Sequence, residues 1–308
     1  DNNTPKILYN FTDGQLFNTT YGGEITELNF AFSAVHQKKL HLGMSLNFYD
    51  LNFSQQSILT ELNSDVDGTI LDVELYQENF TSGTGFSANA GFIYKAHQSF
   101  RLGLAYQTPT WYNELLQDTN YDQDSSIDIG ETTFFPENEE IFSEFNDRQL
   151  ISYRLQTPSK LTASAAFIFG KKGLLSLDYI NKNYQKIKLS DGVFINENQH
   201  FQNDLKNTHN YNIGTEWRFD SFSVRGGYNF EQTPNTSNFL NDNSVMNFSD
   251  IEGYSLGGGY NFGNFKLDFA YSNNNSTSSY NFYNGFNVKP ADLALDNRIF
   301  TTTVTLNL

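Results

Sequence analysis

The chain has no cysteine among its 308 residues. This absence excludes a disulfide framework and any metal site built from thiolates. It agrees with an oxidising envelope compartment but does not by itself assign one.

Basic residues are also scarce, with 19 Lys and Arg against 35 Asp and Glu, so the formal net charge is -16. Proteins that bind nucleic acid need clustered Lys and Arg to neutralise phosphates. The balance therefore excludes nucleic acid as the expected partner.

Long apolar runs are missing as well. No stretch reaches the roughly 18 consecutive apolar residues that a membrane-spanning helix requires. The start of the chain carries no secretory signal, so we expect Asp1 to begin a mature or trimmed chain.

Aromatic residues, in contrast, are abundant. The chain has 29 Phe, 18 Tyr and 22 Gly, yet hydrophobic residues make up only 38% and the mean hydropathy is -0.51. A soluble protein with this aromatic content would bring more aliphatic residues to fill its core. A transmembrane barrel needs apolar residues only at alternate positions and concentrates aromatics at the membrane boundaries. The composition favours the barrel.

Strict alternation of apolar and polar residues recurs along the whole chain. Over 265–271, Phe265, Leu267, Phe269 and Tyr271 alternate with polar or small residues, and 40–48, 100–106, 222–229 and 254–262 repeat the pattern. A period of two indicates strands with two different faces. A soluble β-sandwich would alternate too, but here the polar face is mostly Gly, Ser and Ala with isolated charges, as expected of a lumen.

The predicted connections alternate between short and long. Tight turns are expected at 37–39, 96–98, 170–173, 219–221 and 261–264, and long segments at 53–85, 109–159, 184–207, 232–251 and 274–296. Short turns at one rim and long loops at the other are typical of outer-membrane barrels. We therefore predict an all-β fold, a transmembrane antiparallel β-barrel of the outer membrane, forming a single domain over 1–308. Its longest extracellular loops are 53–85 and 109–159.

The pattern gives about eleven strands, with 1–23 as a polar loop on the long-loop side. Bacterial single-chain barrels have an even number of strands, so we expect an odd number of N-terminal strands to be missing from the chain. The alternative is that 1–23 contains one short strand, at Lys6 to Phe11, which would give twelve.

Two segments resemble a known family. Residues 83–112, from Gly-Thr-Gly-Phe-Ser to Thr-Pro-Thr-Trp-Tyr, and residues 155–179, which include Leu-Gln-Thr-Pro-Ser-Lys-Leu, are similar to successive hairpins of FadL/TodX-type outer-membrane transporters. The resemblance implies a fourteen-stranded barrel in the outer membrane of a Gram-negative bacterium. It also implies an N-terminal hatch and a kinked early strand through which ligand leaves sideways. The hatch and that strand are expected to be absent here, because fourteen minus eleven leaves three strands.

The same resemblance implies that the two longest loops form an apolar groove that captures ligand. The candidate ligand-binding residues in them are Ile70, Leu71, Val73, Leu75, Phe80, Trp111, Tyr112, Leu115 and Leu116. An apolar ligand would be held mainly by buried area, at about 25 cal/mol per Å². The alternative is that these residues only pack the loops together, which is the more common role of apolar loop residues.

An acidic run follows in the second loop, with Asp118, Asp122, Asp124, Asp128 and Glu131. An EF-hand starting at Asp118 would need Gly at its sixth position and Glu at its twelfth, but Gln123 and Ile129 stand there. No cofactor is predicted beyond Ca²⁺ in a different oxygen-ligand site near 118–131; otherwise the run is a solvated acidic loop.

The polar face carries charges of both signs, which we expect to pair across the lumen: Glu27, His41, Arg101, Asp178, Glu216, Arg218, Arg225, Lys266 and Asp268. The five histidines show no catalytic or metal-ligand spacing, so we predict no catalytic residue, no metal site and no enzyme.

The first hypothesis is a passive outer-membrane transporter of hydrophobic small molecules such as long-chain fatty acids, with membrane lipid and the ligand as partners. The second is a structural or partner-docking outer-membrane barrel, for example an accessory subunit of a secretion or uptake complex. Its partner would be another chain that completes the barrel or docks on it. A soluble sandwich adhesin is the least favoured.

Overall fold

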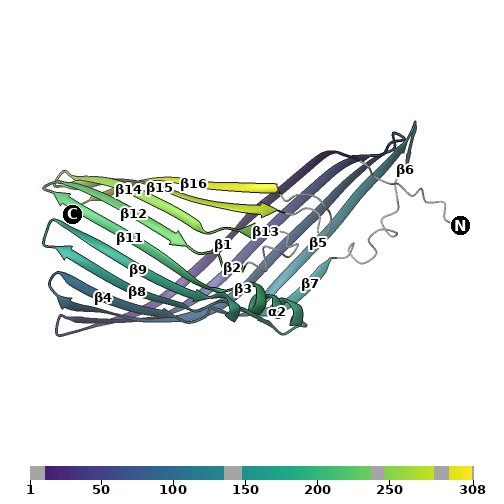
Figure 1. The fold of residues 1–308 in the computed structure, drawn as a ribbon. Helices are drawn as coiled ribbons and strands as arrows, with labels where there is room; N and C mark the ends of the chain where they lie inside the picture. Colours follow the sequence, from purple (N-terminus) through teal and green to yellow (C-terminus); the bar gives the residue numbers. More distant parts are fainter. Residues whose placement is uncertain (1–10, 135–147, 237–245, 281–290, 307–308) are drawn as a thin grey trace. The chain divides into compact units, whose positions relative to one another are not determined.

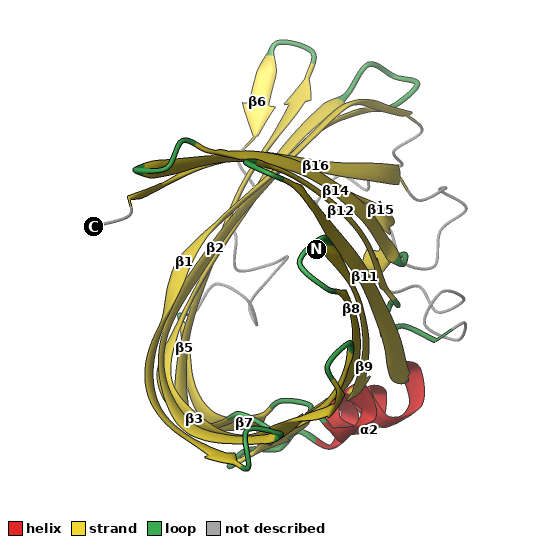
Figure 2. Cartoon of the chain, turned by 90° about the vertical axis from the view of Figure 1, so that its left-hand side faces the viewer, coloured by secondary structure: helices red, strands yellow, loops and turns green. Residues whose placement is uncertain are grey.

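The computed structural model describes residues 11–134, 148–236, 246–280 and 291–306, and these are mainly antiparallel β-strands (Figures 1 and 2). The eleven strands predicted from the alternation are all present: β1 (Phe11–His36), β2 (Leu40–Ser64), β3 (Ile70–His97), β4 (Phe100–Gln107), β8 (Lys160–Phe169), β9 (Gly173–Asn183), β11 (Asn207–Phe219), β12 (Phe222–Glu231), β14 (Ile251–Asn261), β15 (Phe265–Tyr280) and β16 (Ala291–Leu306).

These strands form an up-and-down meander in which each pairs with its neighbours along the chain. The prediction of an all-β antiparallel sheet is therefore confirmed. Among the described residues, β1 pairs only with β2 and β16 only with β15, so the sheet keeps two edges and is not closed.

The predicted long connections contain further strands and helices. These are β5 (Trp111–Ile129), β6 (Thr132–Phe134), β7 (Gln149–Gln156), the 3-10 helix η1 (Tyr184–Lys186), β10 (Lys188–Ser190), α2 (Ile195–Asp204) and β13 (Met246–Phe248). Within the described ranges, no helix combines the length and the apolarity needed to cross a membrane.

The contacts divide the chain into two compact units, and the single domain over 1–308 stays a prediction. Unit 1 contains residues 1–28, 48–85 and 112–154, and unit 2 contains residues 29–47, 86–111 and 155–308. Strands β1, β2, β3, β5 and β7 contribute residues to both units.

Unit 1 corrects three loop predictions. The segment 53–85 is not a loop, because β2 continues to Ser64 and β3 begins at Ile70 after a tight turn in which Asp65 accepts from the amide of Thr69. The segment 109–159 likewise contains β5, β6 and β7, with 135–147 outside the described residues. Residues 11–23, predicted as part of a polar loop, are the first half of β1; the candidate strand at Lys6 lies outside the described residues apart from its last position.

The predicted tight turns of unit 2 are confirmed. Positive φ angles occur at Gln37 (49°) and Lys38 (55°) in one turn, at Gly170 (60°) in another and at Asp220 (51°) in a third. Two-residue hairpin turns need such left-handed backbone to match the twist of the strands.

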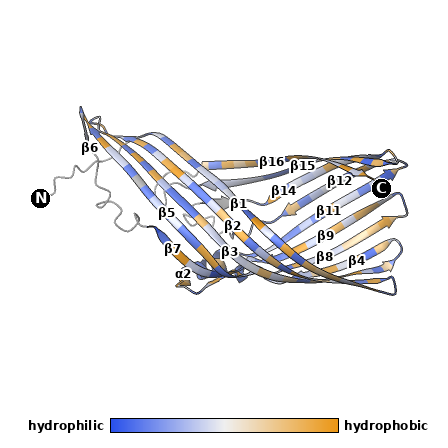
Figure 3. Ribbon diagram, turned by 180° about the vertical axis from the view of Figure 1, so that it is seen from behind, coloured by the Kyte–Doolittle hydropathy of each residue, from blue (hydrophilic) through white to orange (hydrophobic). Residues whose placement is uncertain are grey.

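The apolar face of unit 2 carries two groups of aromatic residues. At the tight-turn ends, Phe169 and Trp217 stack with ring centroids 5.4 Å apart, and Phe219 pairs in register with Phe222. About six positions further along the strands lie tyrosines, including Tyr211. Figure 3 shows the alternation of hydrophobic and hydrophilic residues along these strands. Two aromatic girdles bordering an apolar band are the expected outer surface of a transmembrane barrel.

Candidate functional site

The polar face of unit 2 contains an open hollow of about 570 Å³ over β2, β3, β4, β8 and β9. In a barrel this face is the lumen wall, since the opposite face carries the apolar residues. A volume of this size falls within the range of about 300–1,000 Å³ for small-molecule pockets. We call this site the hollow.

The wall of the hollow is built from small residues. Cross-strand partners share a face of the sheet, and the register places Gly103 between Ile93 on β3 and Ser164 on β8. Two positions further along the strands, Ala166 on β8 pairs with Ser176 on β9. Because these side chains are short, the sheet itself forms the floor.

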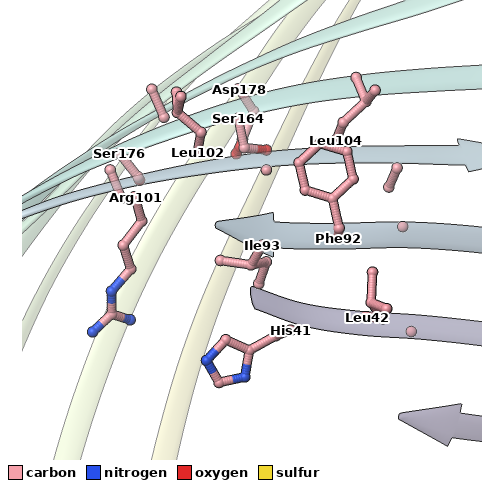
Figure 4. Close-up of a pocket in the computed structure, with 16 residues that line it drawn as sticks. His41, Leu42, Phe92, Ile93, Arg101, Leu102, Leu104, Ser164, Ser176 and Asp178 are labelled. Carbon is pink, nitrogen blue, oxygen red and sulfur yellow. The ribbon is translucent and has the colours of Figure 1, made fainter. Parts of the chain in front are cut away.

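Three charged or titratable side chains lie around this floor (Figure 4). His41 comes from β2, Arg101 from β4 and Asp178 from β9, where Asp178 pairs in register with Ser164. Arg101 and Asp178 form no hydrogen bond or ion pair with any residue that the structure describes, and the His41 Nε2 is buried without a described partner. The hollow therefore offers unused donors and an unused acceptor.

A second hollow, of about 610 Å³, lies on the apolar face behind the first. It is lined by outward side chains such as Phe32, Met44 and Tyr106, and it shares Gly43 and Gly91 with the first hollow. At these two glycines, therefore, no described side chain covers the polar side of the sheet.

Five other charges of the polar face form a continuous ion-pair network. Arg225 on β12 donates to Glu216 on β11 at 2.8 Å and to Asp268 on β15 at 2.7 Å. Arg218 reaches Glu216 at 2.6 Å, and Lys266 lies 3.0 Å from Asp268. The charges were expected to pair across the lumen; these five pair along the wall instead, between strands or along one strand.

Glycine on β14 makes this network possible. Arg225 must pass over β14 to reach Asp268, and its register partner there is Gly257. A Cβ on Gly259 would lie 2.1 Å from the Asp268 Oδ1. The run of glycines at 257–259 thus leaves room for charged side chains from the adjacent strands.

The nine predicted ligand-binding residues lie on strands rather than loops. Leu71, Tyr112 and Leu115 are the buried hydrophobic residues of the described chain, at 9%, 8% and 2% exposure. Ile70, Leu75, Phe80 and Leu116 are exposed, and Val73 and Trp111 are half-buried. On β3, Leu71, Val73 and Leu75 occupy alternate positions, whereas Ile70 and Phe80 occupy the others.

The role of these residues in ligand binding stays a prediction. Trp111 belongs to unit 2, where its ring lies 5.2 Å from Phe86, and the other eight belong to unit 1. Leu115 packs over Gly83, whose added Cβ would meet the Leu115 Cδ2 at 2.8 Å. For the three buried residues, packing is the role that the structure shows.

The acidic run near 118–131 is also mainly strand. In β5 the carboxylates of Asp118, Asp122 and Asp124 lie at alternate positions, about 7 Å or more apart along the strand. Arg148 forms a bidentate ion pair with Asp118, and hydrogen bonding from that guanidinium lowers the pKa of the Asp118 carboxyl. Within the described part of the chain, no three His, Cys, Asp or Glu side chains are grouped so that they could hold a metal ion.

Sequence reasoning missed the hollow. It identified His41, Arg101 and Asp178 as lumen charges but assigned no ligand to them. The small residues of the polar face were the available signal, but the register that brings Gly103 beside Ser164 is a property of the folded sheet.

Comparisons with known proteins give matches in structure alone. No family model and no curated protein matches the chain. Among solved structures, a Pseudomonas aeruginosa FadL homologue is 14% identical, with 90% of this chain and 75% of that chain covered and a TM-score of 0.48. The CymD monoaromatic hydrocarbon channel is 11% identical, with 94% and 86% covered and a TM-score of 0.43.

The Pseudomonas putida toluene transporter TodX is 10% identical, with 84% of this chain and 82% of that chain covered and a TM-score of 0.38. The FadL/TodX-type proteins that the two hairpins resemble are thus among the solved structures that the chain matches.

Proposed function

We propose that the chain is a passive channel for hydrophobic small molecules in the outer membrane of a Gram-negative bacterium. The observation that carries the proposal is the hollow on the polar face, whose floor is backbone and small side chains. A lumen wall that served only to seal a barrel would fill this space with larger side chains, because protein interiors pack densely. The aromatic girdles of the opposite face support the membrane location.

Long-chain fatty acids are one ligand class in this proposal. In unit 1, the exposed Ile70 and Phe80, which occupy the same set of alternate positions on β3, offer apolar contacts for first capture. Passage along the lumen wall then needs no energy source, since a hydrophobic ligand moves from water towards the membrane down its own free-energy gradient.

The experiment is to fill the hollow without disturbing the sheet. A Cβ on Gly43 would meet only the Phe32 carbonyl oxygen at 4.0 Å, and a Cβ on Gly103 would make contacts of 3.4 Å or longer. Gly43→Leu combined with Gly103→Leu should abolish growth of a Gram-negative host on toluene or oleate when this protein is the sole entry route.

Gly226→Leu is the matched control, because its Cβ also meets nothing closer than 3.9 Å and Gly226 lies on the apolar face, paired with Leu256. Growth should be unchanged in this variant. Equal growth of the filled variant and the control, at equal amounts of folded protein in the outer membrane, would contradict the proposal.

A second function, docking of a partner, is favoured by the two sheet edges. Phe300 and Val304 on β16 are 72% and 59% exposed, and the outer backbone groups of β16 have no strand partner among the described residues. Unpaired backbone groups are very costly in lipid. We propose that strands of another polypeptide cover these edges.

The chain has no cysteine, so a single Thr302→Cys variant, whose side chain lies on the same face of β16 as Phe300 and Val304, gives a specific probe of this edge. Disulfide or thiol-specific crosslinking to a second polypeptide in native membranes would support docking. Full accessibility of the introduced thiol to a lipid-soluble reagent, with no crosslinked product, would contradict it.

A further inference from the structure

The hollow has two chemically different ends. Arg101 and His41 extend to one side in Figure 4, away from Asp178 and Ser164. One end therefore presents hydrogen-bond donors and a permanent positive charge, and the other end presents a carboxylate and a hydroxyl.

Arg101 is available to a ligand. On the same face, Arg225 is occupied by two carboxylates and Arg218 by one. Arg101 has none among the residues that the structure describes, although the chain carries 35 acidic residues against 19 basic ones. A guanidinium is always charged and presents a planar fork of donors that fits a carboxylate in a bidentate pair.

His41 adds a second argument. Its Nε2 is buried and has no described hydrogen-bond partner. A buried polar atom left without a partner is costly, so such atoms usually find one in the protein, water or a ligand. Because this nitrogen has almost no exposed surface, the imidazole must turn towards the hollow before a ligand oxygen can bind it.

The glycines form the barest part of the floor, and their extent sets the ligand body that fits there. Gly43 on β2, Gly91 on β3 and Gly103 on β4 expose bare backbone across three adjacent strands. Three strands span roughly 10 Å between the outer two. Among the polar-face residues that line the hollow, Ile93 has the largest apolar side chain.

From this geometry we propose, given the channel function above, that the hollow selects compact carboxylic acids with an apolar body of about one ring. The carboxylate binds Arg101 and His41, and the ring lies on the glycine floor against Ile93. Asp178 repels the carboxylate, so the acid binds in one orientation, with its apolar end towards β9.

The test compares benzoate with toluene, which has a methyl group in place of the carboxylate. Binding is measured by titration to the full chain in lipid nanodiscs, with empty discs as the blank. The wild type should bind benzoate, and Arg101→Gln should weaken it by about tenfold to a hundredfold, as expected when a charge-assisted hydrogen bond is lost. His41→Phe should weaken benzoate by a smaller factor.

Asp178→Asn should act in the opposite direction and tighten benzoate several-fold, because it removes a like charge. Toluene binding should change less than twofold in all three variants. Arg218→Gln is the matched control, since Arg218 lies on the same face, pairs with Glu216 and is outside the hollow. It should leave both ligands unaffected.

Benzoate binding that is equal in the wild type and Arg101→Gln, or weakened by Asp178→Asn, would overturn the inference. If toluene still supports growth while benzoate does not bind, only this inference fails. If toluene neither binds nor supports growth, the channel function itself fails. Loss of both ligands in Arg101→Gln, with the hairpin sheet intact by circular dichroism, would assign Arg101 a structural role and also overturn the inference.

Discussion

Two glycine-containing regions of the polar face of unit 2 differ: Gly43 and Gly103 beside the hollow, and Gly257 and Gly259 on β14. Beside the hollow, an added Cβ would find free space or ordinary contacts. On β14, the space above Gly259 is already filled by the carboxylate of Asp268.

The charged side chains of the two regions differ correspondingly, since those near β14 are paired and Arg101 beside the hollow is not paired with any described residue. Arg225 is bound by Glu216 and Asp268, whereas Arg101 has no described partner. The region around β14 is thus fully packed, because glycine there makes room for the protein's own side chains. In the other, glycine leaves room that the described protein does not use. The difference indicates which charges stabilise the sheet and which are available for a ligand.

The largest expected effect on stability comes from a substitution in the packed region around β14. Gly259→Val would place a Cβ 2.1 Å from the Asp268 Oδ1 and 2.9 Å from the Ser223 Oγ, so the ion pair or the strand must move. We expect a loss of at least about 2 kcal/mol in the free energy of unfolding, as for overpacking combined with a broken polar network. Gly43→Leu should cost less than about 0.5 kcal/mol, because it meets free space. Urea unfolding in lipid vesicles measures both, and equal losses would remove the distinction between the regions.

A smaller effect is expected when the two arginines are compared directly. Arg225→Gln leaves Glu216 with Arg218 and Asp268 with Lys266, so each carboxylate keeps one partner. We expect a loss of about 1–2 kcal/mol in the free energy of unfolding, typical of a lost charge-assisted hydrogen bond. Arg101→Gln should change it by less than about 0.5 kcal/mol. If Arg101→Gln proved as destabilising as Arg225→Gln, Arg101 would belong to the wall.

The comparison also shows how far the sequence determines the fold. Alternation located all eleven strands of the meander, because a sheet between lipid and a lumen places two different environments on alternate residues. In unit 1 the same signal was present at Leu71, Val73 and Leu75, which alternate with Asp72 and Glu74. The prediction of a long loop overrode it, and the segment is strand.

The candidate site was less accessible to prediction. Apolar residues of 70–80 and 111–116 were interpreted as a ligand groove, but Leu71, Tyr112 and Leu115 are buried. The hollow depends on residues of five strands, far apart in sequence, that only the register brings together. Residue types indicated a polar face of small side chains. Which of these side chains lie next to one another could be learned only from the structure.

The smallest expected effect concerns an ion pair outside both regions, between Asp118 and Arg148 in unit 1. Hydrogen bonding from Arg148 lowers the pKa of the Asp118 carboxyl in the folded chain, opposed by desolvation and supported by charge attraction. A group whose folded pKa is lowered stabilises the fold above its unfolded pKa of about 3.9, and this contribution is lost as the pH falls through the folded value.

Wild type and Asp118→Asn should therefore differ slightly at pH 7, with the wild type more stable, and the difference should vanish at pH values below the folded pKa. Because Arg148 is 71% exposed, solvent screening keeps the effect small, and added salt should reduce it further. Unfolding midpoints of the two proteins, measured across this pH range at low and high salt, give the sign. A difference that grows as the pH falls would contradict the ion-pair assignment, because protonation of Asp118 can only remove this contribution.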